Sequence, residues 1–149
     1  MKYYNLLLMS ILSFLSMYIL MYIMVDQYAN VYSNFNQLYM AGIMTIPMIF
    51  IELWLMDSMY TNKRLNFLII LFNCIAFIVF MIGIRKQIAI DDIQFLKSMI
   101  PHHAAALLMC KEAQLHDSEI IQLCKNITAS QQSEIDFMKL KLEMIKKSL

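Results

Sequence analysis

The hydrophobic residues of the chain are concentrated in its first 84 positions, where they form three long apolar runs at about residues 6–25, 38–56 and 65–84. Each run has about 20 residues, which at roughly 1.5 Å of helix rise per residue matches a bilayer core of about 30 Å. A cleaved signal peptide is the alternative for the first run. However, this run exceeds the usual apolar length of about 7–15 residues, and no small-residue cleavage site follows it. The pattern therefore predicts a membrane domain over residues 1–87 with three transmembrane helices.

The remaining residues, 88–149, show a different pattern. In two stretches, 92–115 and 118–147, apolar residues recur every three or four positions, as they do in amphipathic helices. Asp117 or Ser118 is a candidate N-cap between them, and the short connection requires antiparallel packing. The sequence therefore predicts an all-α protein, in which three transmembrane helices are followed by an extramembrane antiparallel helical hairpin.

Basic residues flanking the apolar runs predict the orientation in the membrane. Lys2 precedes the first run and "KR" at 63–64 lies in the second loop, whereas the loop at 26–37 has no Lys or Arg. This distribution places the N-terminus in the cytoplasm and the hairpin outside. The "RK" pair at 85–86 opposes this orientation.

Composition narrows the classes of function. Hydrophobic residues make up 60% of the 149 positions, charged residues 15%, and the formal net charge is +1. Since there is no basic stripe, a nucleic-acid partner is not expected. The apolar composition instead implies that the chain has a lipid bilayer as its partner. No H-E-x-x-H, nucleophile elbow, P-loop or haem attachment motif occurs, which favours a protein that is not an enzyme.

One stretch of the hairpin carries chemistry that helix packing does not require. It reads "FLKSMIPHHAAALLMC" at residues 95–110. Pro101 removes the helical hydrogen bond to the Lys97 carbonyl, and it either kinks the helix or begins a new one. If the hairpin turns near Asp117, three pairs of residues lie at equal heights: His103 with Gln131, Met99 with Ile135, and Cys110 with Cys124.

Imidazole and thioether groups together select soft metal ions. Thioethers bind Cu(I), whereas Zn(II) prefers thiolate, imidazole and carboxylate. The candidate ligands are His102, His103, Met99, Met109 and Met138, with Gln131 and Glu134 orienting the imidazoles or supplying an oxygen ligand. The alternative is that the histidines pack or titrate without a metal and that the methionines fill the core.

Three interpretations of Cys110 and Cys124 are open. They form a disulfide if their Cα atoms come within about 7 Å. They are otherwise two buried thiols or additional soft ligands.

Two motifs in these helices resemble a known family. Met99-Ile100-Pro101-His102-His103 with Ala106 matches its M-I-P-H-H-x-x-A motif, and Gln131-x-x-Glu134-Ile135-x-x-Met138 matches its Q-x-x-E-I-x-x-M motif. Over about residues 91–144 the chain resembles the domain of unknown function three-zero-five family, and its upstream half looks like the membrane-anchored subgroup. The resemblance implies a ferritin-like helical bundle, copper binding as in some secreted relatives of the bacterial periplasm, and a bacterial inner membrane.

A single hairpin of this length cannot bury its apolar stripe alone, so a homo-oligomer is expected, with a dimer forming a four-helix bundle as the simplest case. The second apolar run carries another pattern, with Met40, Met44 and Met48 four residues apart and Glu52 continuing the stripe. Core packing explains such a stripe in most proteins, although Glu52 is costly inside a membrane unless it has a partner.

The function that these observations predict is capture of Cu(I) by a membrane-anchored binding protein, for copper tolerance or delivery. A metal-free assembly or sensor module is the alternative. A ferritin-like oxidase would need a Glu-x-x-His pair, whereas Glu112 and His116 lie four apart. A metal-transport channel has only the methionine stripe in its favour.

Overall fold

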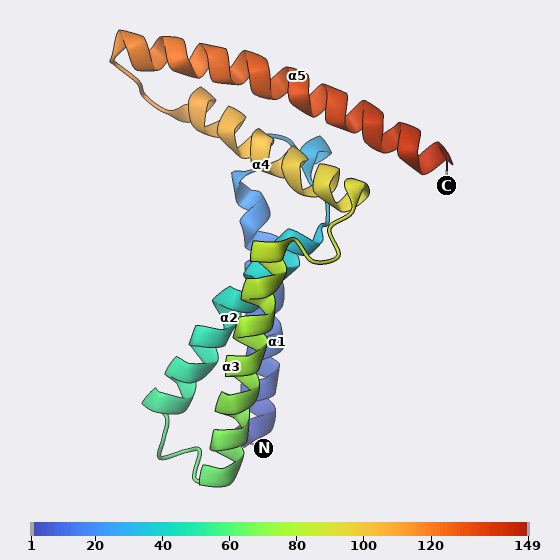
Figure 1. Cartoon of the computed structure of the whole chain (residues 1–149). Coiled ribbons are helices and arrows are strands. Elements are labelled where there is room, and N and C mark those ends of the chain that lie inside the picture. Colours follow the sequence, from blue (N-terminus) through green and yellow to red (C-terminus); the bar gives the residue numbers. More distant parts are fainter. Residues whose placement is uncertain (1, 149) are drawn as a thin grey trace. The chain divides into compact units, whose positions relative to one another are not determined.

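The computed structural model describes residues 2–148, and within them every regular element is a helix (Figure 1). Five α-helices and two short 3-10 turns follow one another as α1 Lys2–Leu20, η1 Met21–Met24, η2 Tyr28–Asn30, α2 Phe35–Leu55, α3 Lys63–Lys86, α4 Asp92–Glu112 and α5 Ser118–Ser148. The chain divides into two compact units. The first contains the residues up to Met21 and Asn36–Ala89, and the second contains Tyr22–Phe35 and the residues from Ile90 onward.

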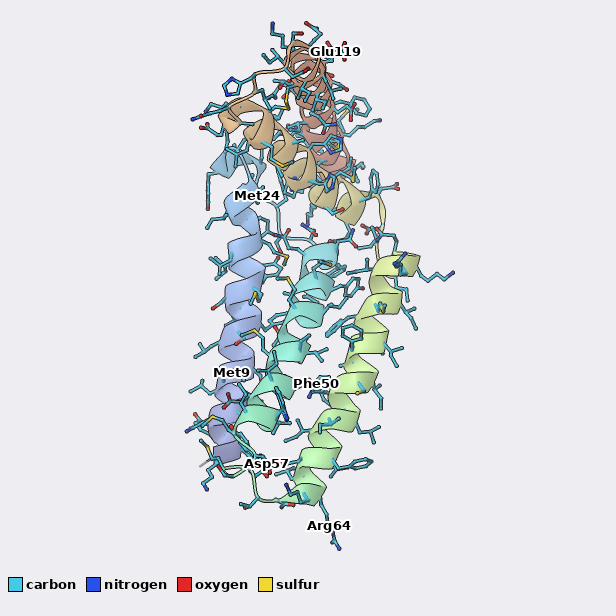
Figure 2. The ribbon with its side chains drawn as sticks, turned by 90° about the vertical axis from the view of Figure 1, so that its left-hand side faces the viewer. Met9, Met24, Phe50, Asp57, Arg64 and Glu119 are labelled. Atoms are coloured by element: carbon cyan, nitrogen blue, oxygen red, sulfur yellow. A yellow bond between two sulfur atoms is a disulfide. The ribbon has the colours of Figure 1, made fainter. Side chains whose placement is uncertain are left out.

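Three helical segments of the chain are long and apolar enough to cross a membrane: Lys2–Met24, Phe35–Leu55 and Lys63–Lys86. They coincide with the three apolar runs of the sequence, so the expectation of three such helices is confirmed. Most of their side chains point outward from the helices in Figure 2, and only α2 buries as much as a third of its apolar window. This exposure is suited to hydrocarbon surroundings, in which the outer face of a helix needs no protein cover.

The helix α2 packs through a face of small and branched residues, which are Ala41, Gly42, Thr45, Ile46, Ile49 and Leu53. The Phe80 ring of α3 lies directly against Gly42, and the Tyr39 ring lies against Gly83 of α3. The stripe of Met40, Met44 and Met48 lies on the other, exposed side of α2. These methionines are therefore more exposed than the packed face of α2, and Met48 also lines a pocket against α1.

A cluster of hydrogen-bonded polar side chains lies in this unit at the connection between α2 and α3. Tyr60, whose side chain is almost fully buried, donates from its hydroxyl to Glu52 Oε1 at 3.1 Å. Burial raises the pKa of Tyr60, and the hydrogen bond to Glu52 and its negative charge raise it further. Asn66 donates to the Tyr60 carbonyl at 2.7 Å and accepts from the Tyr3 hydroxyl at 2.7 Å. Glu52 thus has the partner that an acid near the end of a span requires.

In the second unit α4 and α5 lie side by side in opposite directions (Figure 1). Their contact face is a core of buried apolar side chains: Leu96, Ile100, Ala104 and Leu107 from α4, and Ile135, Met138 and Leu142 from α5. Asp91 caps α4 by accepting from the Gln94 amide, and Asp117 accepts from the amides of Glu119 and Ile120 at the start of α5. Of the two N-cap candidates for the second of these helices, Asp117 and Ser118, the structure uses Asp117.

Pro101 lies inside α4, which continues through it without a break. The segment 22–35 packs against this helix and belongs to the second unit, although it lies between the first two apolar runs in the sequence. Val25 and Tyr32 contact the apolar core of α4 and α5. A division of the chain at residue 87 does not anticipate this addition, because the segment itself carries no pattern that points to α4.

Candidate functional site

His103 is the centre of the polar chemistry between α4 and α5. Its side chain is about nine-tenths buried, and both of its ring nitrogens have partners. Nδ1 lies 3.0 Å from the Met99 carbonyl oxygen, one turn back on α4. Nε2 lies 2.8 Å from Glu134 Oε2 on α5. Two elements therefore fix the orientation of the ring.

The α5 residue that contacts His103 lies about one helical turn beyond the residue that is as far from the turn as His103 is. Gln131 is the residue expected opposite His103, but the structure brings Glu134 there. The reason is that helical side chains lean toward the N-terminus of their own helix. In antiparallel helices His103 leans away from the turn and Glu134 leans toward it, so long side chains meet with this offset.

Glu134 is held on both carboxylate oxygens. Ser130, one turn earlier on α5, donates to Oε1 at 2.8 Å, and Oε2 faces His103. These contacts lower the pKa of Glu134, with the Ser130 hydrogen bond as the largest cause and the His103 hydrogen bond next, while partial desolvation opposes them. Glu134 is thereby favoured as a carboxylate, which is an acceptor only.

The two hydrogen bonds of His103 determine which ring nitrogen can bind a cation and which one orients the ring. The Met99 carbonyl oxygen and the Glu134 carboxylate both only accept, so an N–H on either ring nitrogen of His103 has a protein acceptor. A cation that binds Nε2 would take the place of a proton there, and an N–H at Nδ1 that donates to the Met99 carbonyl would still hold the ring. This is the arrangement in which metal-ligating histidines are commonly oriented.

Of the other predicted ligands, some lie in the core of the helix pair and others lie on its surface. Met138 is buried in the core of the helix pair, and Met99 packs against that core. His102 is exposed, with its ring centre 6.1 Å from that of His103. Gln131 is half-buried. Met109 is exposed, and at six residues from His103 it lies about 9 Å further along the α4 axis.

Within residues 2–148, no group of three or more His, Cys, Asp or Glu side chains is arranged to hold a metal ion. His103 and Glu134 supply two such groups, so a metal there would need further donors of another kind, such as thioether sulfur. Met99 and Met138 are the methionines that the structure places in the same core. Imidazole and carboxylate would also suit zinc, whereas the two thioethers are not usual zinc ligands and would favour a soft ion such as Cu(I).

Cys110 and Cys124 form a disulfide, with their Cα atoms 5.4 Å apart. Of the three readings of these cysteines, the structure adopts this one. The bond joins the ends of α4 and α5 that are close to the connector. Cys74 of α3 is a free cysteine.

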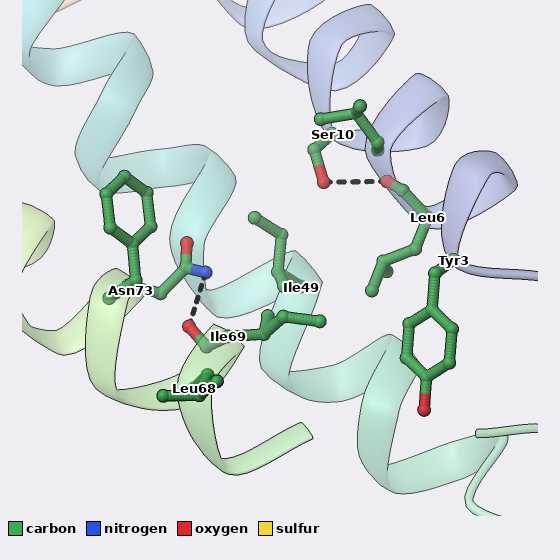
Figure 3. Close-up of a pocket in the computed structure, with 9 residues that line it drawn as sticks. Tyr3, Leu6, Ser10, Ile49, Leu68, Ile69 and Asn73 are labelled. Atoms are coloured by element: carbon green, nitrogen blue, oxygen red, sulfur yellow. Dashed lines mark hydrogen bonds between the residues drawn. The ribbon is translucent and has the colours of Figure 1, made fainter. Parts of the chain in front are cut away.

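A cavity of about 350 Å³ lies between the helices of the first unit (Figure 3). Apolar side chains make up most of its lining, together with Tyr3, Ser10 and Asn73. Ser10 donates to the Leu6 carbonyl and Asn73 to the Ile69 carbonyl, each within its own helix. Because these donors are engaged by the backbone, the cavity is an apolar space and does not resemble a polar ligand site.

Ser130 is the site residue that the sequence reasoning missed. It lies four positions before Glu134 on the same helix, a spacing at which side chains meet. This spacing is a signal that could have identified it. A serine on a polar helix face is otherwise unremarkable, and only its bond to Glu134 assigns it to the site.

The fold defines the chain as an all-helical protein with three helices able to cross a membrane and a disulfide-linked helix pair. The family described as domain of unknown function (DUF305) matches residues 85–147. An uncharacterized protein of Acanthamoeba polyphaga mimivirus is 37% identical over 135 residues, which cover 89% of this chain and 87% of that protein. No solved structure matches the chain. The chain belongs to the DUF305 family.

Proposed function

We propose that the protein is a membrane-anchored binding protein that captures a soft metal ion, Cu(I), for copper tolerance or delivery. The observation that carries the proposal is the hydrogen-bonded pair of the buried His103 and Glu134, on the same two helices that bring Met99 and Met138 to their common core. Cu(I) bound at Nε2 would use an imidazole ring that the Met99 carbonyl oxygen orients through Nδ1. Met99 and Met138 would supply thioether ligands, which need no deprotonation.

The remaining predicted residues take different roles in this proposal. His102, exposed beside His103, would be the entry ligand that transfers an ion from water to the buried ring. Glu134, and Gln131 one turn earlier, would orient the imidazoles or supply oxygen. Met109 would meet an incoming ion at the surface, since its position along α4 separates it from His103.

The membrane orientation is part of the same proposal. The disulfide is consistent with a helix pair on the oxidising side of a membrane, where such bonds persist. The N-terminus would then be cytoplasmic and the helix pair an extramembrane hairpin. A bacterial inner membrane stays a prediction, since the relative described above is viral. A homodimer forming a ferritin-like four-helix bundle also stays a prediction.

A Cu(I) titration of the full chain in detergent, against a chromogenic Cu(I) chelator, tests the proposal. We expect His103→Ala to weaken Cu(I) binding by at least about tenfold, as loss of a ligand or its support does. Met138→Leu, which keeps the volume but removes the sulfur, should also weaken it. Met144→Leu is the matched control, because Met144 is exposed on α5 away from the core. Equal affinity of all variants, or tighter binding of Zn(II) than Cu(I), would contradict the proposal.

A second function has one observation in its favour. Both nitrogens of His103 have protein partners, one on α4 and one on α5, so the His103–Glu134 pair would serve as a structural link between the two helices. A metal-free assembly or sensor module would use it in this way. That function predicts that adding or chelating copper changes neither the thermal midpoint nor the oligomeric mass of the full chain.

A further inference from the structure

The disulfide between Cys110 and Cys124 borders an open cleft at the connector end of α4 and α5. The cleft has a volume of about 470 Å³ and is lined by Cys110, Ala113, Leu115, Ile121, Cys124, Lys125, Thr128 and Ala129. The surrounding connector is exposed and polar, with Gln114, His116 and Asp117 on its surface. A molecule dissolved in water can therefore reach the lining of the cleft.

The groups around the cleft favour reaction at one sulfur over the other. Thiol–disulfide exchange is faster when the departing sulfur is stabilised as a thiolate. Lys125 follows Cys124 in α5 and lines the same cleft, so it brings a positive charge to the side of the cleft that holds Cys124, and a positive charge near a cysteine favours its thiolate. Cys110 lies in the last turn of α4, where the carbonyl end of the helix disfavours a thiolate. Cys124 is therefore the better leaving group and Cys110 the sulfur that is attacked.

We propose that this cleft is a thiol–disulfide exchange site whose substrate is a small thiol carrying a carboxylate. In the first step the substrate thiolate forms a bond to Cys110 sulfur, and the bond between Cys110 and Cys124 breaks. Its electron pair leaves on Cys124 as a thiolate, beside Lys125. A second substrate thiolate then attacks the mixed disulfide. This releases the oxidised substrate and a thiolate on Cys110, and both cysteines are reduced by two electrons in all.

The preference for a carboxylate follows from the charge of the cleft. Lys125 is the charged residue in the lining, and an anionic substrate would pair with it as it approaches. The volume accommodates a molecule of the size of a short peptide. The site is separate from His103 along α4, and it does not depend on metal binding.

The test uses the full chain in detergent with Cys74→Ser, which removes the free thiol. Reduced glutathione is the anionic probe and cysteamine the cationic one, compared at equal thiolate concentration. Trapped samples are analysed by intact mass and peptide mapping. We expect the mixed disulfide on Cys110 and reaction about fivefold or more faster with glutathione than with cysteamine, a ratio typical of one nearby charge at low salt.

Two further lysine variants separate the local charge from the fold. Lys125→Gln should lose the preference for glutathione, and Lys125→Arg should keep it. Lys111→Gln should also keep it, because Lys111 lies at the same end of α4 and pairs with Glu112 at 3.5 Å outside the cleft lining. Circular dichroism confirms that each variant is folded before its rates are compared.

Three results would overturn the proposal. The first is a disulfide that resists both thiols while the helices remain folded. The second is attachment of the probe to Cys124 instead of Cys110. The third is a preference for glutathione that is absent, or that survives in Lys125→Gln.

Discussion

The side-chain amide of Asn34 donates to the carbonyl oxygen of Lys97, at 3.4 Å, across 63 positions of the sequence. Pro101 has no N–H, so this carbonyl lacks the donor that the helix would otherwise supply four residues later. Asn34 is buried and also donates to the Tyr32 carbonyl at 3.0 Å. The segment before α2 thus compensates for the proline that precedes the two histidines.

Replacing Asn34 with alanine should destabilise the second unit by about 1 kcal/mol, the usual value of one hydrogen bond. Hydrogen exchange of α4 amides in the full chain measures this change. The loss should be smaller in a Pro101→Ala background, because residue 101 then regains its own N–H. An equal loss in both backgrounds would show that Asn34 does not act through the Lys97 carbonyl.

Removing the Ser130 hydroxyl should raise the pKa of Glu134. The Ser130 hydrogen bond is the largest cause of the lowered pKa, so Ser130→Ala removes that cause and leaves the contribution of His103. A carbon NMR titration of labelled glutamate measures it. Ser133→Ala is the control, because Ser133 donates to the Ser130 carbonyl and not to Glu134.

The stability that Glu134 contributes should depend on pH in a defined direction. Its pKa in the folded chain is below the ordinary value of 4.5, so the contribution is complete above that value. It is lost as the pH falls through the lower pKa of the folded chain. The thermal midpoint of Glu134→Gln should therefore lie below that of the wild type at neutral pH and approach it in acid. A difference that grows in acid would contradict this assignment.

The core between α4 and α5 should be sensitive to cavities. Ile135 is completely buried, so Ile135→Ala should destabilise the helix pair by about 3 kcal/mol, within the range for such truncations. Leu140 lies on the same helix but is exposed, and Leu140→Ala should change stability by less than about 0.5 kcal/mol. Hydrogen exchange of the α5 amides compares the two. A similar loss for Leu140→Ala would indicate that this face is covered in the assembled protein.

Packing between α2 and α3 should depend on Gly42. A Cβ added there would overlap the Phe80 ring, whereas one added at Gly83 would lie 3.3 Å from the Tyr39 ring. Gly42→Ala should therefore lower stability by about 1–3 kcal/mol, as overpacking does, and Gly83→Ala by less. Phe80→Ala should relieve part of the effect of Gly42→Ala in the double variant. Thermal unfolding in detergent gives the four midpoints.

Several features of the site were open to prediction from local pattern. Cys110 and Cys124 are equally far from the turn, and their short side chains meet at that level, as the disulfide shows. His103 and Glu134 have longer side chains, and the lean of those side chains moves their meeting point by one turn. Pairing residues that are equally far from the turn therefore predicted the cysteine pair correctly. For His103 the same rule selected Gln131, whereas the structure brings Glu134 there.

The sequence by itself determined the three apolar helices and the positions of the two amphipathic ones. Solubility in hydrocarbon and helical periodicity are properties of a segment and do not require knowledge of its neighbours. Only the tertiary structure decided that Glu134 faces His103 and that Asn34 reaches the Lys97 carbonyl. These contacts depend on the direction of individual side chains and on the folding of a distant segment onto α4. Neither of these features produces a periodic pattern in the sequence.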